Sequence, residues 1–231
     1  MSTFDGFSPE ALKFLSEIAH NNNREWFQSN KKRYQEVLQQ PAVAFVEAMG
    51  ERLKSLSPNI NIDPRTNGSG NLMRINRDTR FSKDKSPYKT AIAGMFWEGA
   101  GKKTENPAFG FHLESDGMRL MAGMFQFPKP MLTAYREAVD DEKLGNELIK
   151  NIEAVQAKGN YVINGEHYKK APRGYPADHP RVEWLRYNAL YVSYDGGIPP
   201  AILNCPEAVD IIFKHFSDMH PIQQWLAQIN V

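Results

Sequence analysis

Positively charged side chains gather in one short segment of the sequence, residues 74–89, which reads RINRDTRFSKDKSPYK. This segment contains six Lys and Arg and only two Asp, whereas the whole chain has 28 Lys and Arg against 27 Asp and Glu. Guanidinium groups donate paired hydrogen bonds that match the geometry of carboxylates and phosphates. The segment therefore predicts a pocket that binds a phosphate or carboxylate group on a small molecule.

The predicted ligand-binding residues come from this segment and from a later Pro-rich loop, HYKKAPRGYPADHP. In chain order they are Arg74, Arg77, Arg80, Asp84, Lys85, Lys89, Lys170 and Arg173. Tyr88 is the candidate proton donor, and Asp78 is the candidate base or orienting group. These residue types neither identify a cofactor nor decide whether any reaction is catalysed.

The cations can converge on one ligand only if the chain bends. In an extended segment Arg74 and Asp78 point to one face and Arg77 points to the other. Pro87 biases the residue before it away from the helical region, and the neighbouring Ser and Asp residues favour turns. We therefore expect a loop at the end of a strand, with Arg173 of the later loop completing the anion site.

Two other functions remain open for the same segment. The cations could bind nucleic acid, with Phe81, Tyr88 and Trp97 as stacking surfaces, although a net charge of +1 does not favour an extended binding surface. The charges could instead pair with one another in a structural clamp, or dock a protein partner. Because apolar residues such as Phe81 interrupt the charges, we expect the segment to fold against the core and to be desolvated.

Other residues that could carry chemistry give weaker patterns. The six histidines form no HExxH motif and have no cysteine at zinc-binding spacing, so no metal site is predicted. His112 is either a general base facing a cleft or a hydrogen-bonded structural histidine. Cys205, the one cysteine, excludes an internal disulfide and has no local signature of a nucleophile.

Helices are predicted for the first part of the chain, about residues 8–57. Ser8 and Pro9 are typical of a helix start, and the following apolar residues recur on one side. Asn23 can cap a second helix that extends to about Leu38, and Pro41 is expected to start a third. These helices supply apolar faces that must pack against another layer.

A sheet is predicted for about residues 70–127. The stretches 72–75, 90–98, 108–114 and 118–127 alternate or run apolar over strand lengths, and SDG before Met118 predicts a hairpin turn. In 108–114 the large apolar residues fall on one face, which we expect to pack on helices. The first of these strands, 72–75, would deliver the basic segment.

The remaining part, about residues 128–231, is predicted to be mixed. We expect helix from Met131 to about Lys158 with a break near Asp140, an irregular stretch, a short helix, a strand at ALYVSY, and a last helix from near Pro206 that Pro221 kinks or restarts. The fold class is therefore α+β, with an antiparallel sheet of about four or more strands packed against N-terminal and C-terminal helices. We expect one domain over residues 1–231.

Membrane and secretory features are not found in the sequence. No run of 18 apolar residues occurs, and the start MSTFDGFSPE has neither the basic residues nor the apolar stretch of a signal peptide. We therefore expect a cytoplasmic protein that does not bind membranes. The sequence does not indicate an oligomeric state.

The spacing in the basic segment resembles the signature Arg-x-x-Arg-Asp-x-Arg-Phe-x-x-(Asp/Asn)-Lys-x-x-Tyr of a family of bacterial proteins of similar length, catalogued as domain of unknown function 2461. The eight signature positions match Arg74, Arg77, Asp78, Arg80, Phe81, Asp84, Lys85 and Tyr88. The resemblance extends over essentially the whole chain and includes NNNREWF, DGMRLMAGMF and PRGYPADHP. It implies kinship but no activity, because the family has no established biochemical role.

Overall fold

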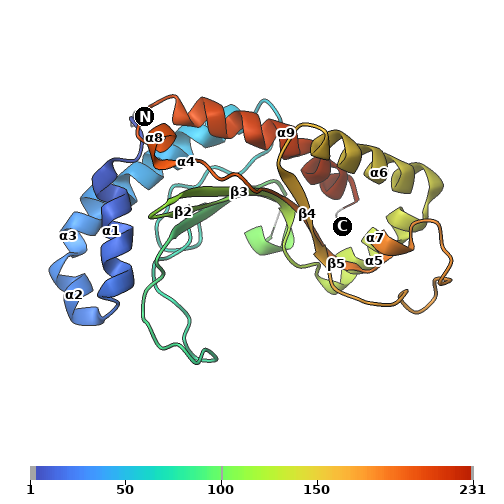
Figure 1. Cartoon of the computed structure of the whole chain (residues 1–231), viewed down its shortest axis with the longest axis horizontal. Coiled ribbons are helices and arrows are strands. Elements are labelled where there is room, and N and C mark those ends of the chain that lie inside the picture. Colours follow the sequence, from blue (N-terminus) through green and yellow to red (C-terminus); the bar gives the residue numbers. More distant parts are fainter. Residues whose placement is uncertain (1–3, 100, 230–231) are drawn as a thin grey trace. The chain divides into compact units, whose positions relative to one another are not determined.

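The computed structural model describes residues 4–99 and 101–229 and has an α+β fold (Figure 1), which confirms the predicted class. Its five strands form one antiparallel sheet in the order β1-β2-β3-β5-β4. The strands are β1 Ile92–Trp97, β2 Ala108–Glu114, β3 Gly117–Met124, β4 Tyr161–Glu166 and β5 Tyr187–Tyr194. Among the described residues, none of the helices combines the length and the apolar composition that crossing a membrane requires.

Helices precede and follow the strands. The α-helices are α1 Pro9–His20, α2 Arg24–Ser29, α3 Lys31–Tyr34, α4 Gln40–Leu53, α5 Lys129–Asp140, α6 Glu142–Gln156, α7 Val182–Leu185, α8 Pro200–Leu203 and α9 Ala208–Ile229. A π-helical turn, η1, covers Gln35–Gln39, and a 3-10 turn, η2, covers Lys103–Glu105.

The chain divides into two compact units. Unit 1 consists of the described part of Met1–Phe96 together with Gly110–Leu120 and Gly197–Lys214. Unit 2 consists of Trp97–Phe109, Met121–Gly196 and the described part of His215–Val231. The single domain expected over residues 1–231 stays a prediction.

Capping side chains fix the first helices of unit 1 as the sequence predicts. The Ser8 hydroxyl accepts a hydrogen bond from the Ala11 N–H at 3.3 Å, and Pro9 is the first residue of α1. The Asn23 side chain accepts from the Trp26 N–H at 2.9 Å and so begins α2. Each cap pairs one of the N–H groups that a helix start leaves without a partner.

Of the two predicted boundaries near Pro41, one is wrong. The second helix ends at Ser29 rather than near Leu38. Pro41 lies in the first turn of α4 as predicted, but α4 follows η1 directly, so helical structure runs from Lys31 to Leu53. Proline lacks an N–H and its ring crowds the carbonyl of the preceding turn. A wider π turn immediately before Pro41 relieves that crowding and keeps the helix continuous.

The apolar face of β2 is buried as predicted. Phe111 in unit 1 and Phe109 in unit 2 are fully buried, whereas His112 is exposed. The Phe111 ring contacts Phe45 of α4 with 5.0 Å between the ring centroids. The Phe109 ring contacts Phe216 of α9 at 5.3 Å. Helices therefore cover this face of the strand in both units.

The segment 72–75 was expected to be a strand, and this is wrong. Leu72 forms an isolated bridge with Gly94 of β1, but a few residues later the chain turns to another partner, and Asn76 bridges Tyr88 instead. A strand needs consecutive pairs with one neighbour. Because this segment changes its neighbour after one bridge, no continuous ladder forms.

Asn71 is a buried centre of hydrogen bonding in unit 1. Its side-chain amide donates to the carbonyl oxygens of Asn61 and Met95, each at 2.9 Å, and its side-chain oxygen accepts from the Asp63 N–H. Its own backbone N–H donates to the Asp63 carbonyl at 2.9 Å, and the Met95 N–H donates to its carbonyl at 3.0 Å. One side chain thus joins the stretch before the basic segment to β1.

In unit 2 the sequence predicts most elements but not β4. The expected break near Asp140 is confirmed, because α5 ends there and Asp141 caps α6 by accepting from the Leu144 N–H at 2.8 Å. Strand β4 pairs antiparallel with β5, with a bulge between Asn164 and Glu166. At that bulge Gly165 has φ of +118°, and an added Cβ would lie 2.1 Å from the Ala189 carbonyl oxygen. The glycine that permits the bulge is also a signal of a turn, which is why the strand escaped prediction.

We predict that Asn71→Ala lowers the free energy of unfolding by about 3 kcal/mol or more. Several polar groups lose their hydrogen-bond partner in this variant, and each such group that is buried costs about 1–3 kcal/mol. Urea denaturation followed by circular dichroism measures this change. Asn67→Ala removes an exposed asparagine from the same stretch and is the matched control. Equal, small losses in both variants would contradict the proposed importance of Asn71.

Candidate functional site

Residues 74–89, called the basic loop below, form a loop in unit 1 whose two limbs pair with each other. The Arg77 N–H donates to the Pro87 carbonyl at 2.9 Å, and the Lys89 N–H donates to the Ile75 carbonyl at 2.8 Å. The turn that the sequence predicts is therefore present. In Figure 1 this part of the chain, coloured teal, extends away from the strands of unit 1.

Asn22 and Phe27 hold the returning limb of the basic loop at Tyr88. The Asn22 side chain donates to the Tyr88 carbonyl at 2.9 Å and accepts from the Tyr88 N–H at 3.0 Å, as a neighbouring strand would. The Tyr88 ring stacks on Phe27 with 4.0 Å between the centroids. Tyr88 is thus a buried anchor, and its role as proton donor stays a prediction.

Three of the predicted ligand-binding cations have partners inside the loop. Arg80 donates two hydrogen bonds to the Asp78 carboxylate, with Nη2 2.7 Å from Oδ2 and Nε 3.0 Å from Oδ1. Arg77 forms an ion pair with Asp84. The Lys85 ammonium donates to the Thr79 carbonyl at 2.9 Å. The two aspartates of the loop therefore each neutralise one arginine, and a backbone carbonyl holds Lys85.

The two aspartates of the loop are strongly stabilised as carboxylates. Hydrogen bonds from the Arg80 side chain and backbone lower the pKa of Asp78 to about 2. The Ser86 hydroxyl and N–H, followed by Arg77, lower the pKa of Asp84 well below its usual range. Both groups are charged at neutral pH and act as acceptors within the loop.

Arg74 and Lys89 differ from these paired cations. Within residues 4–99 and 101–229, neither side chain makes a hydrogen bond or an ion pair. Lys89 is half-buried, and burial followed by the positive charge of Arg74 lowers its pKa. The charge of Lys89 in turn contributes to lowering the pKa of His112 on β2, although desolvation is the larger cause there. Arg74 and Lys89 are therefore neighbouring cations, and the charge of Lys89 acts on His112 of β2.

The expected desolvation of the whole loop is wrong at its tip. Ile75 and Tyr88 are buried near its base, but Phe81 is 95% exposed. The Arg80 guanidinium lies over the Phe81 ring, 5.7 Å from its centroid. The limbs bury their apolar residues because they return to unit 1, whereas the tip lies beyond the reach of the core.

The other two predicted cations, Lys170 and Arg173, belong to unit 2. They line a pocket of about 510 Å³ together with Arg136, Tyr168, Lys169, Ala171 and Pro172. His179, which follows in the same loop, accepts from the Arg181 N–H through Nδ1 at 3.0 Å and contacts the Asp140 carboxylate through Nε2 at 3.0 Å. The joint site that the sequence predicts for Arg173 and the basic loop stays a prediction.

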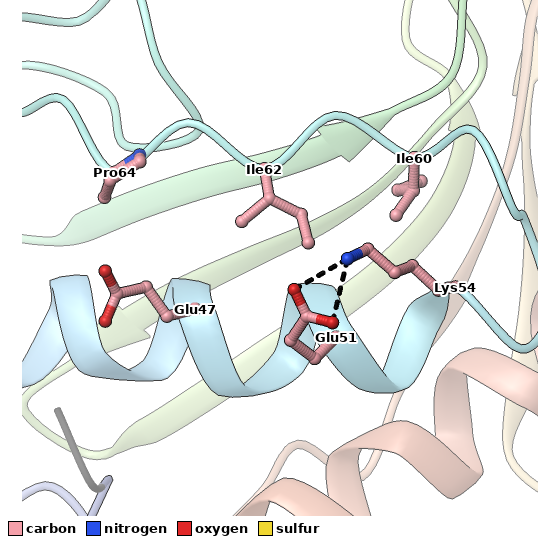
Figure 2. Close-up of a pocket in the computed structure, with 6 residues that line it drawn as sticks. All are labelled: Glu47, Glu51, Lys54, Ile60, Ile62 and Pro64. Atoms are coloured by element: carbon pink, nitrogen blue, oxygen red, sulfur yellow. Dashed lines mark hydrogen bonds and ion pairs between the residues drawn. The ribbon is translucent and has the colours of Figure 1, made fainter. Parts of the chain in front are cut away.

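A further pocket of about 470 Å³ lies in unit 1 between α4 and the segment that follows it. Figure 2 shows its lining residues, Glu47, Glu51, Lys54, Ile60, Ile62 and Pro64. The Lys54 ammonium donates to both oxygens of Glu51, at 2.7 and 2.8 Å. With two carboxylates and a paired lysine, this pocket does not suit an anion.

Sequence reasoning missed a polar cluster in unit 2. The Tyr161 hydroxyl donates to the Asp218 carboxylate at 3.0 Å and lies 2.8 Å from Nδ1 of His215. Burial and the bond to Asp218 raise the pKa of Tyr161 well above its usual range, so the phenol stays neutral. His215 and Asp218 are three residues apart on α9, a spacing that places two side chains on the same face of a helix. The cluster was still missed, because Tyr161 lies on β4, the strand that was not predicted.

No metal site is found in the part of the chain that the structure describes. There, no group of three or more His, Cys, Asp or Glu side chains could hold an ion. Cys205 is a free thiol, and its sulfur donates to the Ile202 carbonyl at 3.1 Å.

We predict that Arg80→Ala raises the pKa of Asp78 from about 2 toward its ordinary value of 3.8, because the carboxylate loses its strongest donor. A carbon-13 NMR titration of the Asp78 carboxyl group measures this. Lys83→Ala is the control, since it removes one exposed positive charge from the same loop. A similar shift in both variants would indicate a general field effect instead of the specific pair.

Comparisons with known proteins identify a family but no individual relative. Neither curated proteins nor solved structures give a match. A family model described as "Conserved hypothetical protein (DUF2461)" matches residues 10–225, which include the basic loop, the sheet and most of α9. This agrees with the resemblance found in the sequence. The chain therefore belongs to the family of domain of unknown function 2461.

Proposed function

We propose that this protein binds a small anionic ligand, a phosphate or carboxylate, on the basic loop through Arg74 and Lys89. The observation that carries the proposal is that these two neighbouring cations have no carboxylate partner among the described residues, while Arg80 has one. Like charges held close together repel each other. An anion bound between them would remove that repulsion.

The arrangement favours recognition of an anion over a reaction. Arg74 can donate two parallel hydrogen bonds to a carboxylate or phosphate, and Lys89 supplies a point charge. An anion beside Lys89 would also offset the desolvation that lowers the pKa of this lysine. Asp78, whose pKa is about 2, is a weak base at neutral pH, so we assign it an orienting role next to Arg80.

The internal ion-pair clamp explains only part of the loop. It accounts for Arg77 and Arg80, which pair with Asp84 and Asp78. The Lys85 ammonium is held by a hydrogen bond to the Thr79 carbonyl. The clamp gives neither Arg74 nor Lys89 a hydrogen-bonded carboxylate among the described residues, although the charge of Arg74 contributes to the lowered pKa of Asp78. We therefore infer that the internal pairs hold the loop in shape and that the unpaired cations face the ligand.

We predict that Arg74→Ala and Lys89→Met each weaken the binding of inorganic phosphate or citrate at least about tenfold, because each removes a charge-assisted hydrogen bond. The dependence of the melting temperature on anion concentration measures the affinity. Lys31→Ala, which removes an exposed cation of α3, is the control. Unchanged anion stabilisation in both loop variants, with the fold intact, would refute the proposal.

Single-stranded nucleic acid is a second candidate ligand, and the exposure of Phe81 favours it. A ring that is 95% exposed between Arg80 and Lys83 can stack on a base while the cations contact phosphates. The other two aromatic residues proposed for stacking are less suitable, because Tyr88 is 4% and Trp97 is 8% exposed. This function would use the tip of the basic loop.

If nucleic acid is the ligand, Phe81→Ala should weaken the binding of a short oligothymidine about tenfold or more, since stacking contributes about 1–3 kcal/mol per base. Fluorescence anisotropy at several salt concentrations measures the affinity, which should fall steeply with salt. Phe125→Ala removes another exposed ring, which is 42% exposed, and is the control. Binding that is absent, or equal in wild type and Phe81→Ala, rejects this candidate.

A further inference from the structure

Four positively charged side chains line the pocket of about 510 Å³ in unit 2, and no carboxylate lines it. Arg136 comes from α5, and the other lining residues follow one another after β4. They are Tyr168, Lys169, Lys170, Ala171, Pro172 and Arg173. The volume lies within the range of about 300–1,000 Å³ that is usual for small-molecule sites.

None of these four cations is neutralised by the pocket itself. Lys169, Lys170 and Arg173 make no hydrogen bond or ion pair with any residue that the structure describes. The nearby carboxylate of Asp140, on the same helix as Arg136, is in contact with His179 at 3.0 Å. The pocket therefore concentrates positive charge, in contrast to the basic loop, where aspartates pair with the arginines.

Arg136 is the most constrained of the four. Its guanidinium lies over the Tyr168 ring at 5.4 Å from the centroid, and its Nε is buried without a hydrogen-bond partner. A buried donor without a partner is unfavourable, so a movement of the Arg136 side chain that brought this donor to a ligand oxygen would be favourable. Stacking fixes the plane of the guanidinium and leaves its other N–H groups available for an anion.

The backbone holds the lining loop in place at both ends of the pocket. The Tyr168 N–H donates to the Arg186 carbonyl at 3.0 Å, next to β5. The Tyr175 N–H donates to the Pro172 carbonyl at 3.2 Å and closes a turn around Arg173. Proline at position 172 restricts the chain further. The cations therefore extend from an ordered loop.

We propose that this pocket is a second anion site, separate in its residues from the basic loop, and that its ligand is an organic diphosphate. Four unneutralised cations match a ligand with two or more negative groups. The Tyr168 ring, Ala171 and Pro172 provide an apolar wall for the organic part of such a ligand. This inference goes beyond the proposed function and does not depend on it.

Isothermal titration calorimetry of the full chain with inorganic pyrophosphate and with ADP tests the proposal. Both probes should bind, and ADP should bind more tightly because it also contacts the apolar wall. Lys170→Ala and Arg173→Ala should each weaken the binding of both probes about tenfold, since each removes one charged donor. Both side chains are exposed and unpaired, so the variants should keep the wild-type circular dichroism spectrum.

Two control variants separate this site from other sources of anion binding. Lys150→Ala, which removes an exposed lysine of α6 in unit 2, should leave both affinities unchanged. Arg74→Ala should affect only anion binding at the basic loop and should leave in place the binding that Lys170→Ala and Arg173→Ala weaken. The proposal is overturned if neither probe binds, or if Lys150→Ala weakens binding as much as Lys170→Ala does. It is also overturned if only Arg74→Ala weakens binding, a result that would instead support the proposed function of the basic loop.

Discussion

No regular strand runs beside the basic loop, yet the backbone N–H and C=O groups near its two ends must still form hydrogen bonds. The loop depends on how this constraint is met. Two asparagine side chains meet this constraint. Asn71 pairs buried groups of Asn61, Asp63 and Met95 just before the loop begins. Asn22 pairs both backbone groups of Tyr88 where the loop returns. Side-chain amides carry a donor and an acceptor, so each can replace a neighbouring strand at one position. The loop is therefore fixed at both ends by residues outside its signature.

Because its base is fixed, the loop can hold two kinds of charged residues, those that pair with each other near the tip and those that stay unpaired at the ends. Asp78 accepts from Arg80 and Asp84 accepts from Arg77, and these pairs shape the tip. Arg74 and Lys89 stand at the two ends of the loop, where Asn71 and Asn22 hold the backbone. Ion pairs as exposed as Arg80 with Asp78 contribute little to stability, because solvent screens them. The base of the loop is therefore held mainly by the hydrogen bonds of Asn71 and Asn22 and by the stack of Tyr88 with Phe27.

Local chemistry explains which features could be predicted from the sequence. The caps at Ser8 and Asn23, the hairpin before β3 and the apolar face of β2 depend on residues within a few positions of each other, and they were predicted correctly. The partner of Asn22 lies 66 residues away, so its role could not be inferred from spacing. The exposure of Phe81 was also missed, because an apolar residue among charges suggests burial unless the length of the loop is known. Strand β4 was hidden by the glycine of its bulge.

The two groups of cations illustrate different ways in which a protein can hold positive charge. In the basic loop each aspartate lowers the local potential, so a ligand there must compete with internal carboxylates or use the cations that they leave free. In the unit 2 pocket no carboxylate lines the site, and repulsion among four cations is relieved only by solvent, salt or a ligand. Binding in that pocket should therefore weaken more steeply with ionic strength than binding at the basic loop. The difference follows from the placement of Asp78 and Asp84, which the family signature contains, and from the absence of acidic residues between Tyr168 and Arg173.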